Sequence, residues 1–149
     1  MSKFHVRAER FIPVAAQQLF DIVADPHQHP RIDGSGTVKT ASATGPEKLS
    51  LGSEFAIGMK IGANYAMTNT VIEYEEGRRI AWKPQGDYVW RYTFTPVEGG
   101  TMVTEEWDAR TSKRRWIMGL LGFPRRNRRG IEQTLERLHN ISVDAIPGS

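Results

Sequence analysis

The chain has 149 residues, of which 39% are hydrophobic and 25% charged, and its formal net charge is +3. A chain of this length and composition typically forms one soluble hydrophobic core, so we expect a single domain over residues 1–149. No run approaches the roughly 18 consecutive apolar residues of a membrane span. The absence of cysteine excludes disulfides and thiolate sites, and residues 1–7 hold no apolar signal-peptide core, which together predict a cytoplasmic location.

The first quarter of the chain predicts a strand, a helix and a connecting segment. In residues 4–12 apolar and polar side chains alternate, which is the period of a half-buried strand. Residues 16–25 repeat apolar side chains at the spacing of one helix face, and Asp25-Pro26 ends the pattern. The following segment, to residue 36, is rich in turn residues and is expected to hold one short helical turn.

Six more strands are predicted in the middle of the chain. Short connections such as Glu98-Gly99-Gly100 join them, which favours an antiparallel meander. The strands are expected over residues 37–44, 55–61, 65–74, 78–84, 88–95 and 101–110.

A long amphipathic helix is predicted over residues 124–144, after a short helical segment over residues 116–121. Ile131, Leu135 and Leu138 recur at a helical period, with Ile141 one turn further on, and charged residues occupy the other faces. Because the rest of the chain is mostly strand, this apolar stripe has only a sheet on which to pack, and we expect the sheet to curl around the helix.

Four segments of the chain, residues 12–26, 72–82, 99–107 and 130–138, carry a resemblance to a known family. With them the sequence resembles the START-like, or SRPBCC, superfamily that includes the birch pollen allergens, and most closely its polyketide cyclase/dehydrase branch. The resemblance implies an α+β helix-grip fold, in which a bent antiparallel sheet of about seven strands wraps round a long C-terminal helix. It also implies either binding of a hydrophobic molecule or cyclase/dehydrase activity.

A sheet bent round one helix typically leaves an elongated cavity that suits an apolar ligand oriented by a few polar groups. We therefore predict that a small hydrophobic molecule, a lipid, polyketide or aromatic metabolite, binds inside. The alternative is that the same side chains simply fill a core. The predicted ligand-binding residues are Phe55, Ile57, Met59, Met67, Asn69, Trp90, Tyr92, Glu105, Trp107, Met118 and Phe123.

Glu105 is the best catalytic candidate. It lies in phase with Val103 and Trp107, so it faces inward if they do. A buried carboxyl group would be a weaker acid, which suits a general acid/base or a partner for a ligand hydroxyl group. The alternatives are an outward Glu105, or an ion pair with Arg91 or Arg110. No complete catalytic constellation is visible, because no partnered base accompanies this acid.

The link after the first helix contains a His-x-His pair, His27 and His29, and a nearby Asp33. Imidazole and carboxylate together can bind zinc or iron. The spacing is common, however, and no third imidazole follows at a ligand-like interval. We therefore predict solvated turn residues and helix caps, and neither a metal nor another cofactor.

Eight basic residues and no Asp or Glu lie between Arg110 and Arg129 inclusive. This cluster predicts contact with an anionic surface, either membrane headgroups or a ribosome, unless it is only a solvated helix face. The apolar segment within it, residues 118–123, is expected to form a lid or a membrane-touching lip, or else to pack on the sheet. The basic residues expected to make the contact are Arg114, Arg115, Arg125, Arg126, Arg128 and Arg129.

The sequence thus leaves three functional hypotheses. The leading one is binding or transport of a small hydrophobic ligand. The second is an enzyme of the polyketide cyclase/dehydrase type. The third is an interaction protein that uses the basic cluster, similar to the branch of the superfamily associated with ribosomes or quinones.

Overall fold

The computed structural model describes residues 3–32, 38–44, 46, 48–61, 63–85 and 87–144, and describes only the backbone of residues 30, 38–44, 57–61 and 63–66. All the helices and strands predicted from the sequence are present, with ends shifted by a few residues. In order they are β1 (His5–Ile12), α1 (Ala16–Val23), the 3-10 turn η1 (Pro26–Gln28), α2 (His29–Ile32), β2 (Val38–Thr44), β3 (Glu54–Ile61), β4 (Ala63–Glu75), β5 (Arg79–Pro84), β6 (Val89–Val97), β7 (Gly100–Asp108), α3 (Arg115–Leu120) and α4 (Phe123–Asp144).

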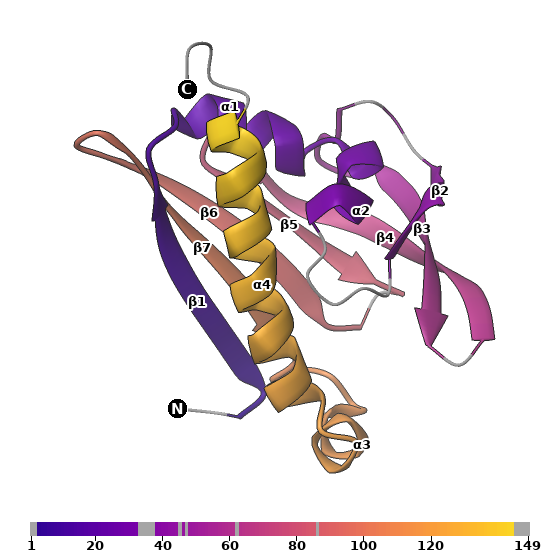
Figure 1. Ribbon diagram of the computed structural model, residues 1–149. Coiled ribbons are helices and arrows are strands. Elements are labelled where there is room, and N and C mark those ends of the chain that lie inside the picture. The colour runs from indigo at the N-terminus through magenta and orange to yellow at the C-terminus, as the bar shows by residue number, and fades with distance from the viewer. Residues whose placement is uncertain are drawn as a thin grey trace.

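The strands form one antiparallel sheet in the order β1-β7-β6-β5-β4-β3-β2. Six strands follow one another as the predicted meander, and β1 adds to the edge beside β7. Figure 1 shows α4 lying across one face of this sheet, with α1 and α3 at opposite ends of α4. We call the face that α4 covers the inner face and its two ends the α1 end and the α3 end.

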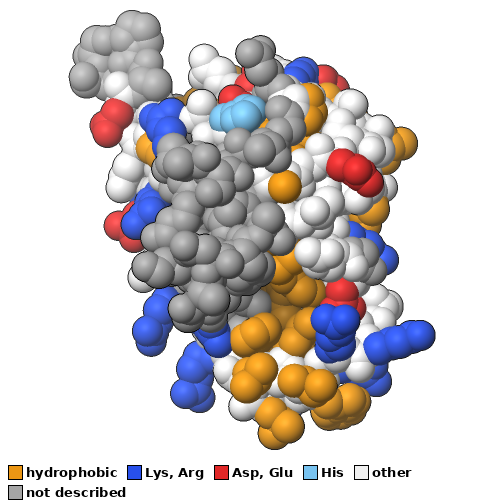
Figure 2. All heavy atoms as spheres, turned by 90° about the vertical axis from the view of Figure 1, so that its right-hand side faces the viewer, with side chains coloured by type: hydrophobic (Ala, Val, Ile, Leu, Met, Phe, Trp, Pro, Cys, Tyr) orange, Lys and Arg blue, Asp and Glu red, His pale blue; other side chains and the backbone are white. Residues whose placement is uncertain are grey.

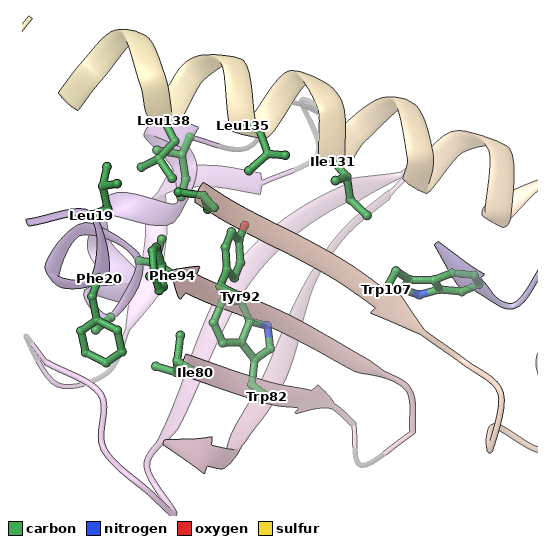
Figure 3. Packing of buried hydrophobic residues seen from close by; sticks show 14 of the residues in the cluster. Leu19, Phe20, Ile80, Trp82, Tyr92, Phe94, Trp107, Ile131, Leu135 and Leu138 are labelled. Atoms are coloured by element: carbon green, nitrogen blue, oxygen red, sulfur yellow. The ribbon is translucent and has the colours of Figure 1, made fainter. Parts of the chain in front are cut away.

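The apolar stripe of α4 is buried on the inner face. Ile131, Leu135 and Leu138 are almost completely buried, and Ile141 is partly buried. Figure 3 shows Leu135, Leu138 and Ile131 pointing from α4 toward the sheet, with the two leucines above Tyr92 and Phe94 on β6. Because burial of one such side chain contributes about 1.5–3 kcal/mol, this stripe fixes α4 on the sheet. The predicted helix-grip arrangement is confirmed.

The α1 end of the inner face is filled by α1. Leu19 and Phe20 are fully buried there, and the Phe20 ring meets Phe94 edge-on at 5.8 Å and Tyr74 at 5.6 Å between ring centroids. This packing fills the α1 end of the interface between α4 and the sheet.

The β6–β7 hairpin is held close to the end of β1. The Thr101 hydroxyl donates a hydrogen bond of 2.7 Å to the Val14 carbonyl oxygen. A Cβ added to Gly100 would lie 2.8 Å from Pro13 Cα and even closer to the Ile12 carbonyl oxygen. Only glycine leaves room for this contact between two backbones.

A polar network fastens α1 to the turn between β4 and β5. The Glu76 carboxylate accepts hydrogen bonds from Lys48 Nζ at 2.7 Å, the Tyr74 hydroxyl at 2.6 Å and Gln17 Nε2 at 2.8 Å. These three donors, Lys48 first, lower the pKa of Glu76 to about 2. The side chain is about half exposed, so water weakens each contact.

We predict that Gly100→Ala destabilises the protein by about 2 kcal/mol, because the new methyl group forces two backbones apart. Urea denaturation followed by circular dichroism would measure the change. Glu98→Ala in the exposed part of the same turn is the matched control and should change stability little. Equal stability of the two variants would contradict the close approach at Gly100.

We also predict that the Glu76 network loses its contribution to stability in acid. Because folding lowers the pKa of Glu76, its contribution is complete above about pH 4.5 and disappears as the pH falls toward 2. The loss should be small, because the Lys48 and Glu76 side chains are both about half exposed to water. The free energy of unfolding of Glu76→Gln should fall less steeply over this window than that of the exposed neighbour variant Glu75→Gln. Parallel curves would argue against the network.

Candidate functional site

Three tryptophans lie side by side across the inner face. The strand register pairs Trp82 on β5 with Trp90 on β6, and Trp90 with Trp107 on β7. Trp82 and Trp107 are buried, whereas Trp90 remains partly exposed. Directly opposed residues on neighbouring strands present their side chains on one face of the sheet, so we call these three residues the tryptophan row.

Glu105 lies in the next row of the sheet, toward the α1 end. Its direct neighbours are Tyr92 on β6 and Ala8 on β1. Val103 and Trp107 on either side of it are buried, and Glu105 itself is only 4% exposed. Glu105 therefore faces inward together with Val103 and Trp107, as the alternation along the strand requires. Figure 3 shows Tyr92, its neighbour on β6, extending toward α4.

The two arginines proposed as partners of Glu105 bind other carboxylates on the outer face. Arg91 pairs with Glu73 at 2.6 Å and with Glu106 at 3.7 Å, and Arg110 pairs with Asp108 at 2.8 Å. Hydrogen bonding from Arg91 lowers the pKa of Glu73, and that from Arg110 lowers the pKa of Asp108. Both alternatives for Glu105 are thus wrong: it does not face outward, and it does not form an ion pair with Arg91 or Arg110.

An aromatic cluster surrounds His29 at the start of α2. The His29 ring stacks on Trp82 at 5.0 Å between centroids and meets Phe55 edge-on at 5.3 Å. Its Nε2 atom lies 2.8 Å from the Val23 carbonyl oxygen, and the residue is buried. The prediction of a solvated turn residue is wrong for His29, because α2 folds back onto the sheet and carries the ring with it.

His27 behaves as predicted and is exposed. Its backbone N–H group donates a hydrogen bond of 3.0 Å to the Asp25 carboxylate, which caps η1. His27 also lines an open polar pocket with Asp21, Asp25 and Lys48. Asp33, the third predicted metal-binding candidate, lies outside the described residues. Within the described part of the chain, no three His, Asp or Glu side chains gather closely enough to hold a metal ion.

The β3–β4 side of the predicted site is described in part. Phe55 is buried, Met67 is partly exposed, and the buried Asn69 donates a hydrogen bond of 3.0 Å to the Met67 carbonyl oxygen. Phe55 and Asn69 are register neighbours of each other. Ile57 and Met59 belong to β3, but their side chains lie outside the described part of the structure.

The segment between β7 and α4 divides into buried and exposed side chains. Met118 is buried, and Phe123 is partly buried with the Arg126 guanidinium 4.7 Å above its ring centroid. Trp116 and Leu120, by contrast, are well exposed. The alternative in which Trp116, Leu120 and Phe123 all pack on the sheet is therefore wrong for the first two.

The structure thus brings Trp90, Tyr92, Glu105 and Trp107 onto one surface beneath α4. Sequence reasoning missed two members of this surface, Trp82 and His29. Trp82 had a detectable signal, since it alternates with Ile80 along the same strand. His29 had none, because its burial depends on how a short helix docks.

Comparison with known proteins gives a consistent picture. The family model described as polyketide cyclase / dehydrase and lipid transport matches residues 3–141. The uncharacterized protein Rv0088 of Mycobacterium tuberculosis is 35% identical over 140 residues, which cover 89% of this chain and 62% of that protein. The chain therefore spans less than two thirds of the length of this relative.

Solved structures share the fold at low sequence identity. Protein NE0264 from Nitrosomonas europaea has a TM-score of 0.70 at 15% identity, over 97% of both chains. The Polyketide_cyc-like protein Cgl2372 from Corynebacterium glutamicum has a TM-score of 0.63 at 20% identity, over 93% of this chain and 90% of that one. Among the described residues, no helix is long and apolar enough to cross a membrane. With its fold and its match over residues 3–141, the chain belongs to the polyketide cyclase/dehydrase and lipid-transport family.

Proposed function

We propose that the protein binds a small hydrophobic molecule that carries at least one polar group, on the inner face beneath α4. The observation that carries this proposal is the position of Glu105. This carboxyl group is 4% exposed and lies one row from three tryptophans. In this position a ligand lying along the tryptophan row would bring its polar group close to Glu105.

Burial of a carboxyl group is costly for folding. Removing such a group from water costs several kcal/mol unless other interactions offset it, and an apolar residue of similar size would fill the same space at no such cost. The other inward positions of β7, Thr101, Val103 and Trp107, are also buried, so Glu105 is the ionisable side chain on this face of the strand. An ionisable group kept among buried side chains is suited to recognising a polar group on a ligand.

The apolar part of the ligand would contact the tryptophan row at the α3 end. Trp90 and Phe123 are only partly buried there, while the α1 end is filled by Leu19 and Phe20. Space for a ligand is thus expected between the tryptophan row and the first turns of α4. Burial of apolar ligand area would supply the affinity, at about 25 cal/mol per Å² before the costs of association.

Family membership supports a hydrophobic ligand in general terms, because the family description includes lipid transport. A flat aromatic or polyketide-like molecule fits the aromatic side chains better than a flexible acyl chain does. Stacking on an aromatic ring rewards a planar ligand beyond the area that it buries. The two Mycobacterium tuberculosis relatives are longer than this chain, which matches 62% of their length. Any activity of a whole protein of that length is therefore proposed here and not inferred from the match.

A second candidate function is catalysis of the cyclase or dehydrase type. It is favoured by the strand register, which places Tyr92 and Glu105, a phenol-bearing and a carboxyl-bearing residue, directly opposite each other on neighbouring strands. Such a pair can donate and accept a proton at one reacting centre, while the tryptophan row holds a flexible substrate in a folded conformation.

We predict that Glu105→Gln lowers the affinity for 2-naphthol about fivefold but leaves that for naphthalene within about twofold, because a carboxyl group binds a hydroxyl group more strongly than an amide does. Equilibrium dialysis would measure both affinities.

Native mass spectrometry of protein purified from its own host, followed by denaturation, would identify any natural ligand.

Glu106→Gln is the matched control. Glu106 is the next residue of β7 and contacts His5 on the outer face at 2.8 Å, so its substitution makes the same chemical change on the opposite side of the sheet. The proposal fails if neither probe binds, or if the two variants have the same effect on 2-naphthol binding.

For the catalytic candidate, we predict that Glu105→Gln reduces turnover of a polyketide substrate by at least about 100-fold while its binding changes little, since general acid–base catalysis typically contributes 10²–10⁴-fold. Tyr92→Phe, which removes only the hydroxyl group, should also reduce the rate. Ligand binding without turnover in the unsubstituted protein would leave the binding function as the better description.

A further inference from the structure

The helix α3 and the residue that follows it expose four large apolar side chains. Leu120 is 89% exposed, Trp116 62%, Ile117 61% and Leu121 60%. Single exposed apolar residues are common on proteins, but a group of this size on one short segment marks a contact surface. Figure 2 shows hydrophobic side chains gathered at the lower end of the molecule, where Figure 1 places α3.

These side chains are presented outward by a firmly seated helix. Met118 is buried, and a Cβ added to Gly119 would lie 3.2 Å from the Phe4 ring. The Phe4 ring also meets Trp116 edge-on, with 5.4 Å between the centroids. One side of α3 is therefore packed on the start of β1, and the exposed apolar side chains occupy the remaining surface.

Basic side chains surround this apolar group. All except the partly buried Arg115 are exposed, and the Arg115 guanidinium lies 5.3 Å from the Trp116 ring. Within the described residues, none of these side chains forms an ion pair with a carboxylate. The basic residues are Lys113, Arg114, Arg115, Arg125, Arg126, Arg128 and Arg129.

We propose that this α3 surface, the four exposed apolar side chains and the seven basic ones, docks on the surface of an anionic lipid bilayer. The aliphatic side chains would enter the boundary between headgroups and acyl chains, and the arginines would bind the phosphate groups around them. The clustered positive charge is complementary to a negatively charged membrane and repels itself in the absence of one.

The exposed aliphatic side chains of the α3 surface favour a membrane over a nucleic acid as the partner. RNA binds arginine and stacks on exposed aromatic rings, but it gains little from Ile117, Leu120 and Leu121. A second copy of the chain would bring two positive clusters together. A bilayer with anionic lipids satisfies both the aliphatic and the basic parts of the surface.

The location of the α3 surface would place the inner face near the membrane. Because α3 connects the end of β7 to the start of α4, it lies at the end of the molecule where Trp90 and Phe123 are only partly buried. Docking there would bring this end of the inner face toward the lipid. The docking itself does not depend on the proposed ligand and can be tested without one.

The test is flotation of the full chain with vesicles of phosphatidylcholine, with and without about 30% phosphatidylglycerol. We expect binding to the anionic vesicles alone, weakened several-fold when salt is raised from about 50 mM to about 500 mM. Leu120→Ser/Leu121→Ser should reduce binding at least about tenfold through lost apolar insertion. Arg125→Gln/Arg126→Gln should reduce it and make the remainder less sensitive to salt.

Two controls match these variants elsewhere on the surface. Leu51→Ser removes an apolar side chain that is 66% exposed, and Arg78→Gln removes an exposed arginine. Neither should change binding. Vesicles should also protect Trp116 from acrylamide quenching, and Trp116→Phe should abolish that protection.

Three results would overturn the proposal. The first is binding to anionic vesicles no stronger than to neutral ones. The second is a self-associating protein that Leu120→Ser/Leu121→Ser converts to a monomer, without vesicle binding, which would assign the surface to a second copy. The third is RNA binding that depends on the arginines but not on the leucines, again without vesicle binding.

Discussion

Burial of the apolar stripe of α4 is the constraint on which the rest of the structure depends. A single long helix can bury that stripe only against one face of the single sheet, so Ile131, Leu135 and Leu138 determine which face becomes the interior. Most side chains that share this face are then removed from water, whether they are apolar like Trp107 or ionisable like Glu105. The site we propose is therefore a consequence of the packing and not an addition to it.

Much of this arrangement could be predicted from the sequence, because it follows from local periodicity. The period of two along β7 placed Glu105 on the side of Val103 and Trp107, and the period of α4 identified its buried stripe. The short turns between strands indicated an antiparallel meander. These features depend on neighbouring residues in the chain, and the family resemblance supplied the way in which the helix and sheet combine.

Other features depend on contacts between distant segments and could not be predicted. No local pattern distinguishes the exposed His27 from the buried His29, since the difference arises when α2 folds onto Trp82. The row of tryptophans depends on the register between three strands. The apolar residues of α3 were equally compatible with a packed and an exposed helix, because hydrophobicity indicates a need for burial but not what covers the surface.

The ion pairs on the outer face have a consequence for how the sheet forms. Glu105 and Glu106 are adjacent in β7, so a slip of one residue against β6 would exchange the two carboxylates between core and solvent. In such a misaligned sheet Glu106 would lose its contacts with His5 and Arg91, and Trp107 would turn outward. Contacts run from His5 on β1 through Glu106 on β7 and Arg91 on β6 to Glu73 on β4, which lies beyond β5. Together they favour the observed alignment of these strands over one that is shifted by a residue. Each of these ion pairs contributes little to stability, but together they disfavour the misaligned sheets in which they could not form.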